Sequence, residues 1–118
     1  MPNKKKALKV PNKVKIGYSL FNIESRDEAW KERNGAVGMC KVDKSLIEYC
    51  KEQSQPEIVN TIIHEILHAV VYMFDIDFDT AKKEECLVTK MANGLHTLIL
   101  DNPELLKWLV ESCKNEKK

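Results

Sequence analysis

The segment EIVNTIIHEILHAVVYMF, residues 57–74, has the pattern of a long amphipathic helix. At about 100° per residue, its apolar side chains gather within about 140° of the helix circumference; they are Ile58, Val59, Ile62, Ile63, Ile66, Ala69, Val70 and Met73. The opposite side carries Thr61, His64, Glu65, His68 and Tyr72. Pro56 suits the first turn of a helix, and Glu57 complements the positive end of the helix dipole. We therefore expect this helix to bury its apolar side in a core and to carry both histidines on its polar face.

On this polar face, His64 and His68 flank Glu65 in the motif HEILH. This spacing places the two imidazoles one helical turn apart, where they can bind a single zinc ion. Glu65 lies beside them, placed to accept a proton from a water molecule that the metal activates. Histidines on helices are more often surface or hydrogen-bonded core residues than ligands, and so short a motif has false positives. However, the chain has only three histidines, and two of them take the required positions around a glutamate, which favours a metal site.

A third ligand has to come from another segment, because a catalytic zinc ion usually takes three protein ligands. Residues 81–100 have the periodicity of a second helix, which Thr80 or Asp79 would cap. The candidate ligands in it are Glu84, Glu85 and the remaining histidine, His96. One face of this helix comprises Glu84, Val88, Met91, Leu95 and Ile99, and its flank comprises Glu85, Ala92 and His96. Acidic groups beside an inward-facing apolar stripe are costly unless paired or metal-bound, so either glutamate fits and periodicity does not choose between them.

The remaining segments indicate a small sheet before these helices. The patterns of residues 14–23, 39–42 and 46–50 are typical of strands, with a turn at 43–45. The charged segment 24–33 fits a loop or a short helix around Trp30, and residues 104–113 fit a short amphipathic helix after Pro103. Residues 75–80 contain three aspartates but lack the glycine and the distal glutamate of an EF-hand calcium loop. We expect one domain over residues 14–113, a basic tail over 1–13 and a solvated end over 114–118.

The composition excludes several classes of function. A formal net charge of +1 gives no general basis for binding nucleic acid or membranes, and the apolar runs are too short to span a bilayer. The N-terminus lacks the apolar segment of a secretory signal, so we expect a cytoplasmic protein. The four cysteines form no C-x-x-C pair, which argues against a zinc ribbon and favours free thiols. Cys86, although near the candidate ligands, is expected to be a small buried residue rather than a ligand.

Taken together, the HEILH motif, Glu84-Glu85 and the later Met91-Ala92-Asn93 resemble a minimal zincin. The chain is most similar to small phage-type and prophage-type metallopeptidases related to the ImmA/IrrE and SprT-like groups. The resemblance covers roughly residues 14–109, and its specific part is the two metal-bearing helices. In that family the third ligand is a glutamate that opens the second helix, with a small apolar residue three positions later and alanine seven positions later. Counted from Glu85 these positions are Val88 and Ala92, so the resemblance favours Glu85.

The same resemblance implies an α+β, zincin-like fold: a small antiparallel sheet packed on the HExxH helix, a second metal-ligand helix and a short C-terminal helix. Residues 38–42 or 46–50 would then form the edge strand that lines the cleft. Such an edge can hold a peptide in extended form beside the metal. The helix-turn-helix and the zinc ribbon of some relatives are missing here, so a link to DNA does not carry over.

These observations predict a zinc-dependent peptidase that acts on a protein or peptide substrate. His64, His68 and Glu85 would bind Zn²⁺, and Glu65 would be the general base. His96 and Tyr72 are candidates for stabilising the oxyanion, although both also fit packing or surface roles. The rival hypothesis is a catalytically weak or inactive zinc-containing interaction module, such as a phage-type regulator that binds a host or repressor protein. Its metal site would be closed by a fourth protein ligand, for which Glu84 and Cys86 are the nearest candidates.

Overall fold

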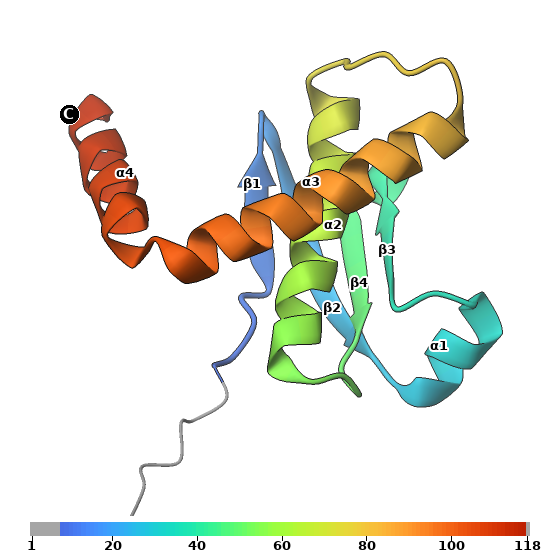
Figure 1. The fold of residues 1–118 in the computed structure, drawn as a ribbon. Helices are drawn as coiled ribbons and strands as arrows, with labels where there is room; N and C mark the ends of the chain where they lie inside the picture. Colours follow the sequence, from blue (N-terminus) through green and yellow to red (C-terminus); the bar gives the residue numbers. More distant parts are fainter. Residues whose placement is uncertain (1–7, 118) are drawn as a thin grey trace, which may run out of the picture.

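The computed structural model describes residues 8–117 as an α+β fold with one small sheet and four α-helices (Figure 1). In chain order the elements are β1 (Lys13–Ile16), β2 (Ser19–Arg26), α1 (Glu28–Asn34), β3 (Gly38–Lys41), a 3₁₀ turn (Val42–Lys44), β4 (Leu46–Cys50), α2 (Gln55–Met73), α3 (Ala81–Asp101) and α4 (Pro103–Glu116). Residues 1–7, which make up most of the predicted basic tail, and residue 118 lie outside the described residues. None of the helices in the described part is both long and apolar enough to cross a membrane.

The sheet is mixed, which corrects the expected antiparallel sheet. Its strand order is β1-β2-β4-β3, with antiparallel pairing of β1 with β2 and of β3 with β4, and parallel pairing of β2 with β4. The cause is the connection through α1: the chain leaves β2, returns as the outer strand β3, and then turns back so that β4 inserts between β2 and β3. β3 therefore lies at an edge of the sheet.

A hairpin replaces the single strand expected over residues 14–23. β1 and β2 pair with Ile16 opposite Ser19, so the chain turns at Gly17 and Tyr18, where Gly17 adopts a φ of +63°. Tyr18 lies in this turn and is 88% exposed, so the strand pattern of residues 14–23 does not mark a covered position here. On β2 the buried positions are Phe21 and Ile23.

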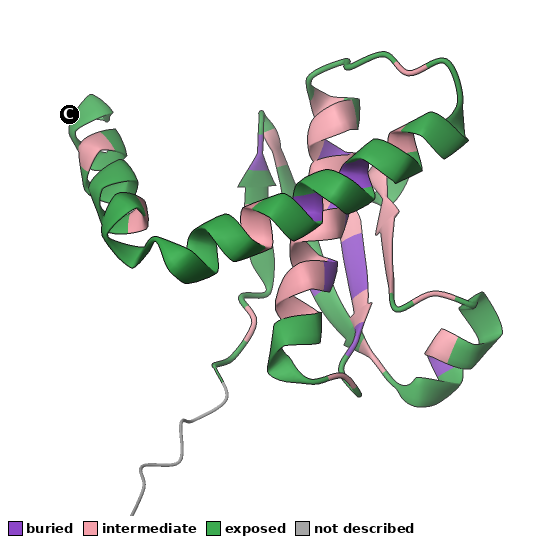
Figure 2. Cartoon of the chain, viewed as in Figure 1, coloured by how far each residue is buried: buried purple, intermediate pink, exposed green. Residues whose placement is uncertain are grey.

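The core lies between one face of the sheet and α2. It is formed by Ile16, Phe21, Ile23, Ile47 and Ala69, and the partly buried side chains of α2 that pack against it are Ile62, Ile66, Val70 and Met73. The expected apolar side of the α2 helix thus faces the sheet, as Figure 2 shows by the buried positions on β4 and α2. The start of α2 is fixed by a capping box, because the Ser54 side chain accepts from the Glu57 backbone N–H and the Glu57 carboxylate accepts from the Ser54 N–H.

The helix α3 crosses α2 and then runs beyond it (Figure 1). Thr80 caps it, as expected, by accepting from the Lys83 backbone N–H. Its buried residues are Val88 and Ala92, whereas Met91 and Ile99, which were expected on the covered face, are 49% and 40% exposed. The packed face is narrower than the pattern predicts because only the first part of the helix lies on α2. The C-terminal helix α4 is present as expected, and none of its described residues is buried.

Candidate metal centre

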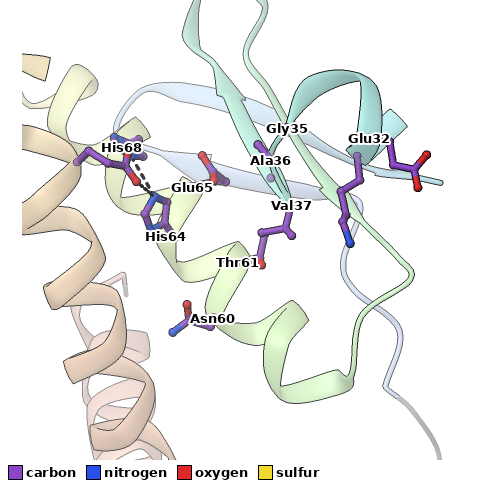
Figure 3. Close-up of a pocket in the computed structure, with 12 residues that line it drawn as sticks. Glu32, Gly35, Ala36, Val37, Asn60, Thr61, His64, Glu65 and His68 are labelled. Atoms are coloured by element: carbon purple, nitrogen blue, oxygen red, sulfur yellow. Dashed lines mark hydrogen bonds and ion pairs between the residues drawn. The ribbon is translucent and has the colours of Figure 1, made fainter. Parts of the chain in front are cut away.

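Three side chains from two helices converge at the centre of the molecule. His64 and His68 lie on α2, and Glu85 lies in the second turn of α3. One oxygen of Glu85 is 2.7 Å from His64 Nε2 and the other is 2.8 Å from His68 Nε2, while the two Nε2 atoms are 3.2 Å apart. This group of donor atoms could hold a metal ion. Figure 3 shows His64, Glu65 and His68 projecting from α2 on the same side.

Glu84 contacts the other nitrogen of His68 rather than the donor group. Its Oε2 atom is 2.7 Å from His68 Nδ1. A carboxylate at this position accepts a hydrogen bond from Nδ1–H, which leaves Nε2 free as a ligand and fixes the orientation of the ring. The two glutamates that the helical pattern could not separate therefore have different positions: Glu85 lies among the donor atoms, and Glu84 lies behind one of them.

The charges of this group shift the pKa values of its members. Burial lowers the pKa of His68, but hydrogen bonds to Glu84 and Glu85 outweigh it, and the net pKa is raised. Burial raises the pKa of Glu85, but the nearby His64 and His68 outweigh it, and the net pKa is lowered. The two shifts have one cause, the close contact of a carboxylate with imidazoles, which favours the charged form of each.

Glu65 is more buried than a residue on a polar helix face is expected to be. It is 7% exposed and Thr61 is 6% exposed, so the polar face of α2 is covered at these positions. The reason is the close approach of β3: a Cβ atom added at Gly38 would lie 2.5 Å from Thr61 Cγ2 and 3.0 Å from Glu65 Oε2. Burial raises the pKa of Glu65 to about 7, with a further rise from the charge of Glu85 and an opposing effect of His68.

Two cavities open on either side of this group. The first, of about 830 Å³, is lined by Lys31, Glu32, Gly35, Ala36, Val37, Gly38, Asn60 and Thr61 together with His64, Glu65, His68 and Glu85. The second, of about 540 Å³, is lined by Met39, Cys40, Val42, Val71, Tyr72, Asp75, Ile76 and Glu84 together with Glu65 and His68. Both cavities have Glu65 and His68 in their lining, so both border the donor group, and we refer to the two together as the cleft.

The other candidate residues lie outside the donor group. His96 contacts Asn60, with 3.5 Å between His96 Nδ1 and Asn60 Nδ2, and Tyr72 is 60% exposed at the second cavity. Cys86 is exposed, so its expected burial is wrong. Among the described residues the donor group contains neither Cys86 nor Glu84, and this arrangement does not favour a closed structural site.

The sequence pattern missed the residues of the second cavity. These side chains come from the end of β3, the C-terminal half of α2 and the connection to α3, and no motif links them. At the first cavity Gly38 carried a signal, since a glycine in a strand often marks the close approach of another group. No protein-family model, curated protein or solved structure compared with this chain matches it. The assignment of function therefore rests on the residues of the site.

Proposed function

We propose that this protein is a zinc-dependent peptidase with a zincin-like site. The observation that supports the proposal is the convergence of two imidazole nitrogens and one carboxylate on a cleft, with a buried glutamate beside them. The two histidines and the glutamate lie on neighbouring helices whose packing sets their separation.

The donor set and its spacing fit zinc. Two histidines and one glutamate are a known ligand set of catalytic zinc sites. Donor atoms of a tetrahedral zinc ion, each about 2.0–2.1 Å from the metal, lie roughly 3.3 Å apart. Here the two Nε2 atoms are 3.2 Å apart, and a different oxygen of Glu85 contacts each of them, at 2.7 and 2.8 Å, while one donor atom from each residue lies within 4.8 Å of the others. Small side-chain movements would therefore bring one oxygen and both nitrogens to the spacing of the ion. The described residues offer three donors, and the fourth position of a catalytic site is taken by water or substrate.

The chemistry divides between the metal and the protein. When bound, zinc would polarise the scissile carbonyl and lower the pKa of the attacking water to about 7. Glu65 would accept the proton of this water and pass it to the leaving amine. Its pKa of about 7 in the metal-free protein suits a group that takes and releases a proton near neutral pH. Glu84 would hold the His68 ring in the orientation that presents Nε2.

The edge strand β3 supports a peptide as the substrate. It pairs with β4 on one side only, and its residues Gly38, Met39 and Cys40 line the cleft. An extended peptide could add to the free edge of β3 by main-chain hydrogen bonds, which would bring one of its carbonyl groups beside the donor atoms.

The substitution Glu65→Gln tests this proposal. The variant keeps the shape of the side chain but removes the base, so it should bind one equivalent of zinc and hydrolyse peptides about 10²–10⁴ times more slowly than the wild type. Zinc is measured by elemental analysis of the purified protein, and hydrolysis by mass spectrometry of a mixture of unstructured peptides. Glu111→Gln is the matched control, because Glu111 is exposed on α4 and lines neither cavity, and it should change neither quantity. Full hydrolysis by Glu65→Gln would refute the mechanism.

A further inference from the structure

The second cavity has more and larger apolar side chains in its lining than the first, whose apolar side chains are Ala36 and Val37. Apart from the residues that it shares with the metal centre, the first cavity has polar side chains in Lys31, Glu32, Asn60 and Thr61. The second is walled mainly by apolar side chains, which are Met39, Cys40, Val42, Val71, Tyr72 and Ile76. Burial raises the pKa of Cys40 to about 12, so this thiol is neutral and adds to the apolar surface.

A helix terminus fixes one wall of this cavity. At the end of α2, the Ile76 N–H donates to Val71 C=O at 2.9 Å and the Asp75 N–H donates to Tyr72 C=O at 3.3 Å. Asp75 has a φ of +54°. These are the bonds and the left-handed residue of a Schellman motif, in which the residue after the turn packs back on the last helical turn. Ile76 is therefore held beside Val71 by the backbone, and both line the cavity.

Apart from His68, the charged side chains that line this cavity are all acidic. Its acidic residues outside the HEILH motif are Asp75 and Glu84, and its lining contains no lysine or arginine. Glu84 is engaged by His68, at 2.7 Å. Asp75 would repel an acidic ligand, and the apolar walls favour an aliphatic or aromatic one. Tyr72 and Ile76 are 60% and 47% exposed, so a ligand that covers them would remove apolar surface from water.

We propose that this cavity is a specificity pocket that binds a large apolar side chain, such as leucine or phenylalanine, next to the cleaved bond of the substrate. The inference rests on the proposed peptidase function. The cavity shares Glu65 and His68 with the metal centre, so a side chain in it belongs to a residue at or near the reacting carbonyl. In an extended peptide alternate side chains point to the same face, which lets one side chain enter the cavity while the backbone follows β3.

The test compares cleavage of peptides that differ at one position. The zinc-loaded wild type is given a series with leucine, phenylalanine, serine, lysine or aspartate at the position next to the cleaved bond, and kcat/KM is measured for each. We expect leucine and phenylalanine to exceed serine by about tenfold or more, and aspartate to be the poorest. Equal kcat/KM values for all five peptides would contradict the specificity pocket but not the peptidase function.

A pair of matched variants locates the preference in the cavity. Ile76→Lys places a positive charge in the wall of the cavity. We expect this variant to lower kcat/KM for the leucine peptide about tenfold or more. We also expect the ratio of kcat/KM for the aspartate peptide to kcat/KM for the leucine peptide to rise. Leu87→Lys is the control, because Leu87 has the same exposure, 47%, and lines neither cavity. An equal effect of both variants on the leucine peptide would contradict the assignment.

A binding measurement separates the pocket from the catalytic proposal. The same peptides, carrying a fluorophore, are titrated with zinc-loaded Glu65→Gln and followed by anisotropy. Tighter binding of the leucine and phenylalanine peptides supports the pocket even if the wild type cleaves nothing, in which case only the peptidase function fails. Equal binding of all five peptides, together with no cleavage, would overturn both.

Discussion

The body of this protein, residues 13–94, which contains the candidate metal centre, and its C-terminal arm, residues 97–117, are both rich in amphipathic helix but differ in what covers the apolar faces. The buried apolar residues are all in the body and are Ile16, Phe21, Ile23, Trp30, Ile47, Cys50, Ala69, Val88 and Ala92. In the arm, side chains of the same kinds are 40–72% exposed; they are Leu98, Ile99, Leu100, Leu105, Trp108, Leu109 and Val110. An amphipathic pattern thus indicates which face of a helix is apolar, but not whether the same chain covers it.

This difference also explains where the chemistry is located. In the body, α2 has the sheet on one side and α3 on another, so its polar side chains are enclosed and acquire shifted pKa values. The arm has no second layer among the described residues, and its charged groups, such as Glu111 with Lys114, form exposed pairs. A solvent-exposed pair of this kind contributes little to stability.

The most direct test of the comparison is the removal of one large side chain from each region. Phe21→Ala should lower the free energy of unfolding by about 3–5 kcal/mol, because Phe21 is fully buried in the core. Trp108→Ala should change it by less than about 1 kcal/mol, because Trp108 is 63% exposed. Both are measured by urea denaturation. A loss for Trp108→Ala as large as that for Phe21→Ala would show that the arm is covered in solution and would break the comparison.

The next effect is the pH dependence caused by burying a carboxylate in the body. Burial raises the pKa of Glu65 from its ordinary 4.5 to about 7, so ionisation of Glu65 above pH 7 opposes folding. In the metal-free protein, Glu65→Gln should therefore be more stable than the wild type by about 3 kcal/mol at pH 8, with the difference disappearing as the pH falls to about 4. Urea denaturation in the presence of a chelator, repeated across this pH range, measures the difference. A constant difference at all pH values would mean that Glu65 has the same pKa in the folded and unfolded states.

A smaller change in stability is expected when alanine replaces either of two glycines, one in a crowded position and one in an open position. Gly38→Ala should destabilise the protein by about 1–3 kcal/mol, because the new methyl group would meet Thr61 and Glu65. Gly94→Ala should stabilise it by about 0.4–1 kcal/mol, because Gly94 lies inside α3 with nothing within 4 Å of the added Cβ. Thermal unfolding of both variants measures the two signs. If Gly38→Ala did not destabilise the protein, β3 would not be packed against α2 as closely as described.

The smallest expected effect is a change in zinc affinity on replacing Glu84, the carboxylate that contacts His68. Glu84→Gln should weaken zinc binding about 10–100-fold, because the His68 ring would lose its charged partner. Glu111→Gln, in the arm, should leave zinc affinity unchanged. Competition with a chromophoric chelator measures both affinities. If Glu84→Gln abolished binding and Glu85→Gln did not, the ligand and supporting roles of the two glutamates would be exchanged.

Much of the fold could be predicted because its signals are local. The helices α2 and α3, the cap at Thr80 and the strand β4 follow from periodicity and from residues next to one another in the chain. The HEILH motif and the choice of Glu85 over Glu84 also needed only the spacing along two helices and a family resemblance. The structure brings these side chains together, and their role as zinc ligands stays a prediction.

The features that could not be predicted depend on long-range pairing. The apolar alternation continues through Gly17 and Tyr18, so it hid the hairpin between β1 and β2. The parallel pairing of β2 with β4 joins segments that the α1 crossover separates, and no local pattern specifies it. The burial of Glu65 likewise depends on how closely β3 approaches α2, which is a property of the packing rather than of either segment.

The capping box at the start of α2 determines where this chain can tolerate an inserted residue. Ser54 and Glu57 begin the helix by their own hydrogen bonds, so an extra residue between the exposed positions 51 and 52 would lengthen the connection before the cap and would disturb the bond of Gln53 to Cys50 C=O. An extra residue between Glu57 and His64 would rotate the histidines by about 100° relative to that starting point. Length variation is therefore tolerable before the cap and not after it, even though only a few residues separate the two positions.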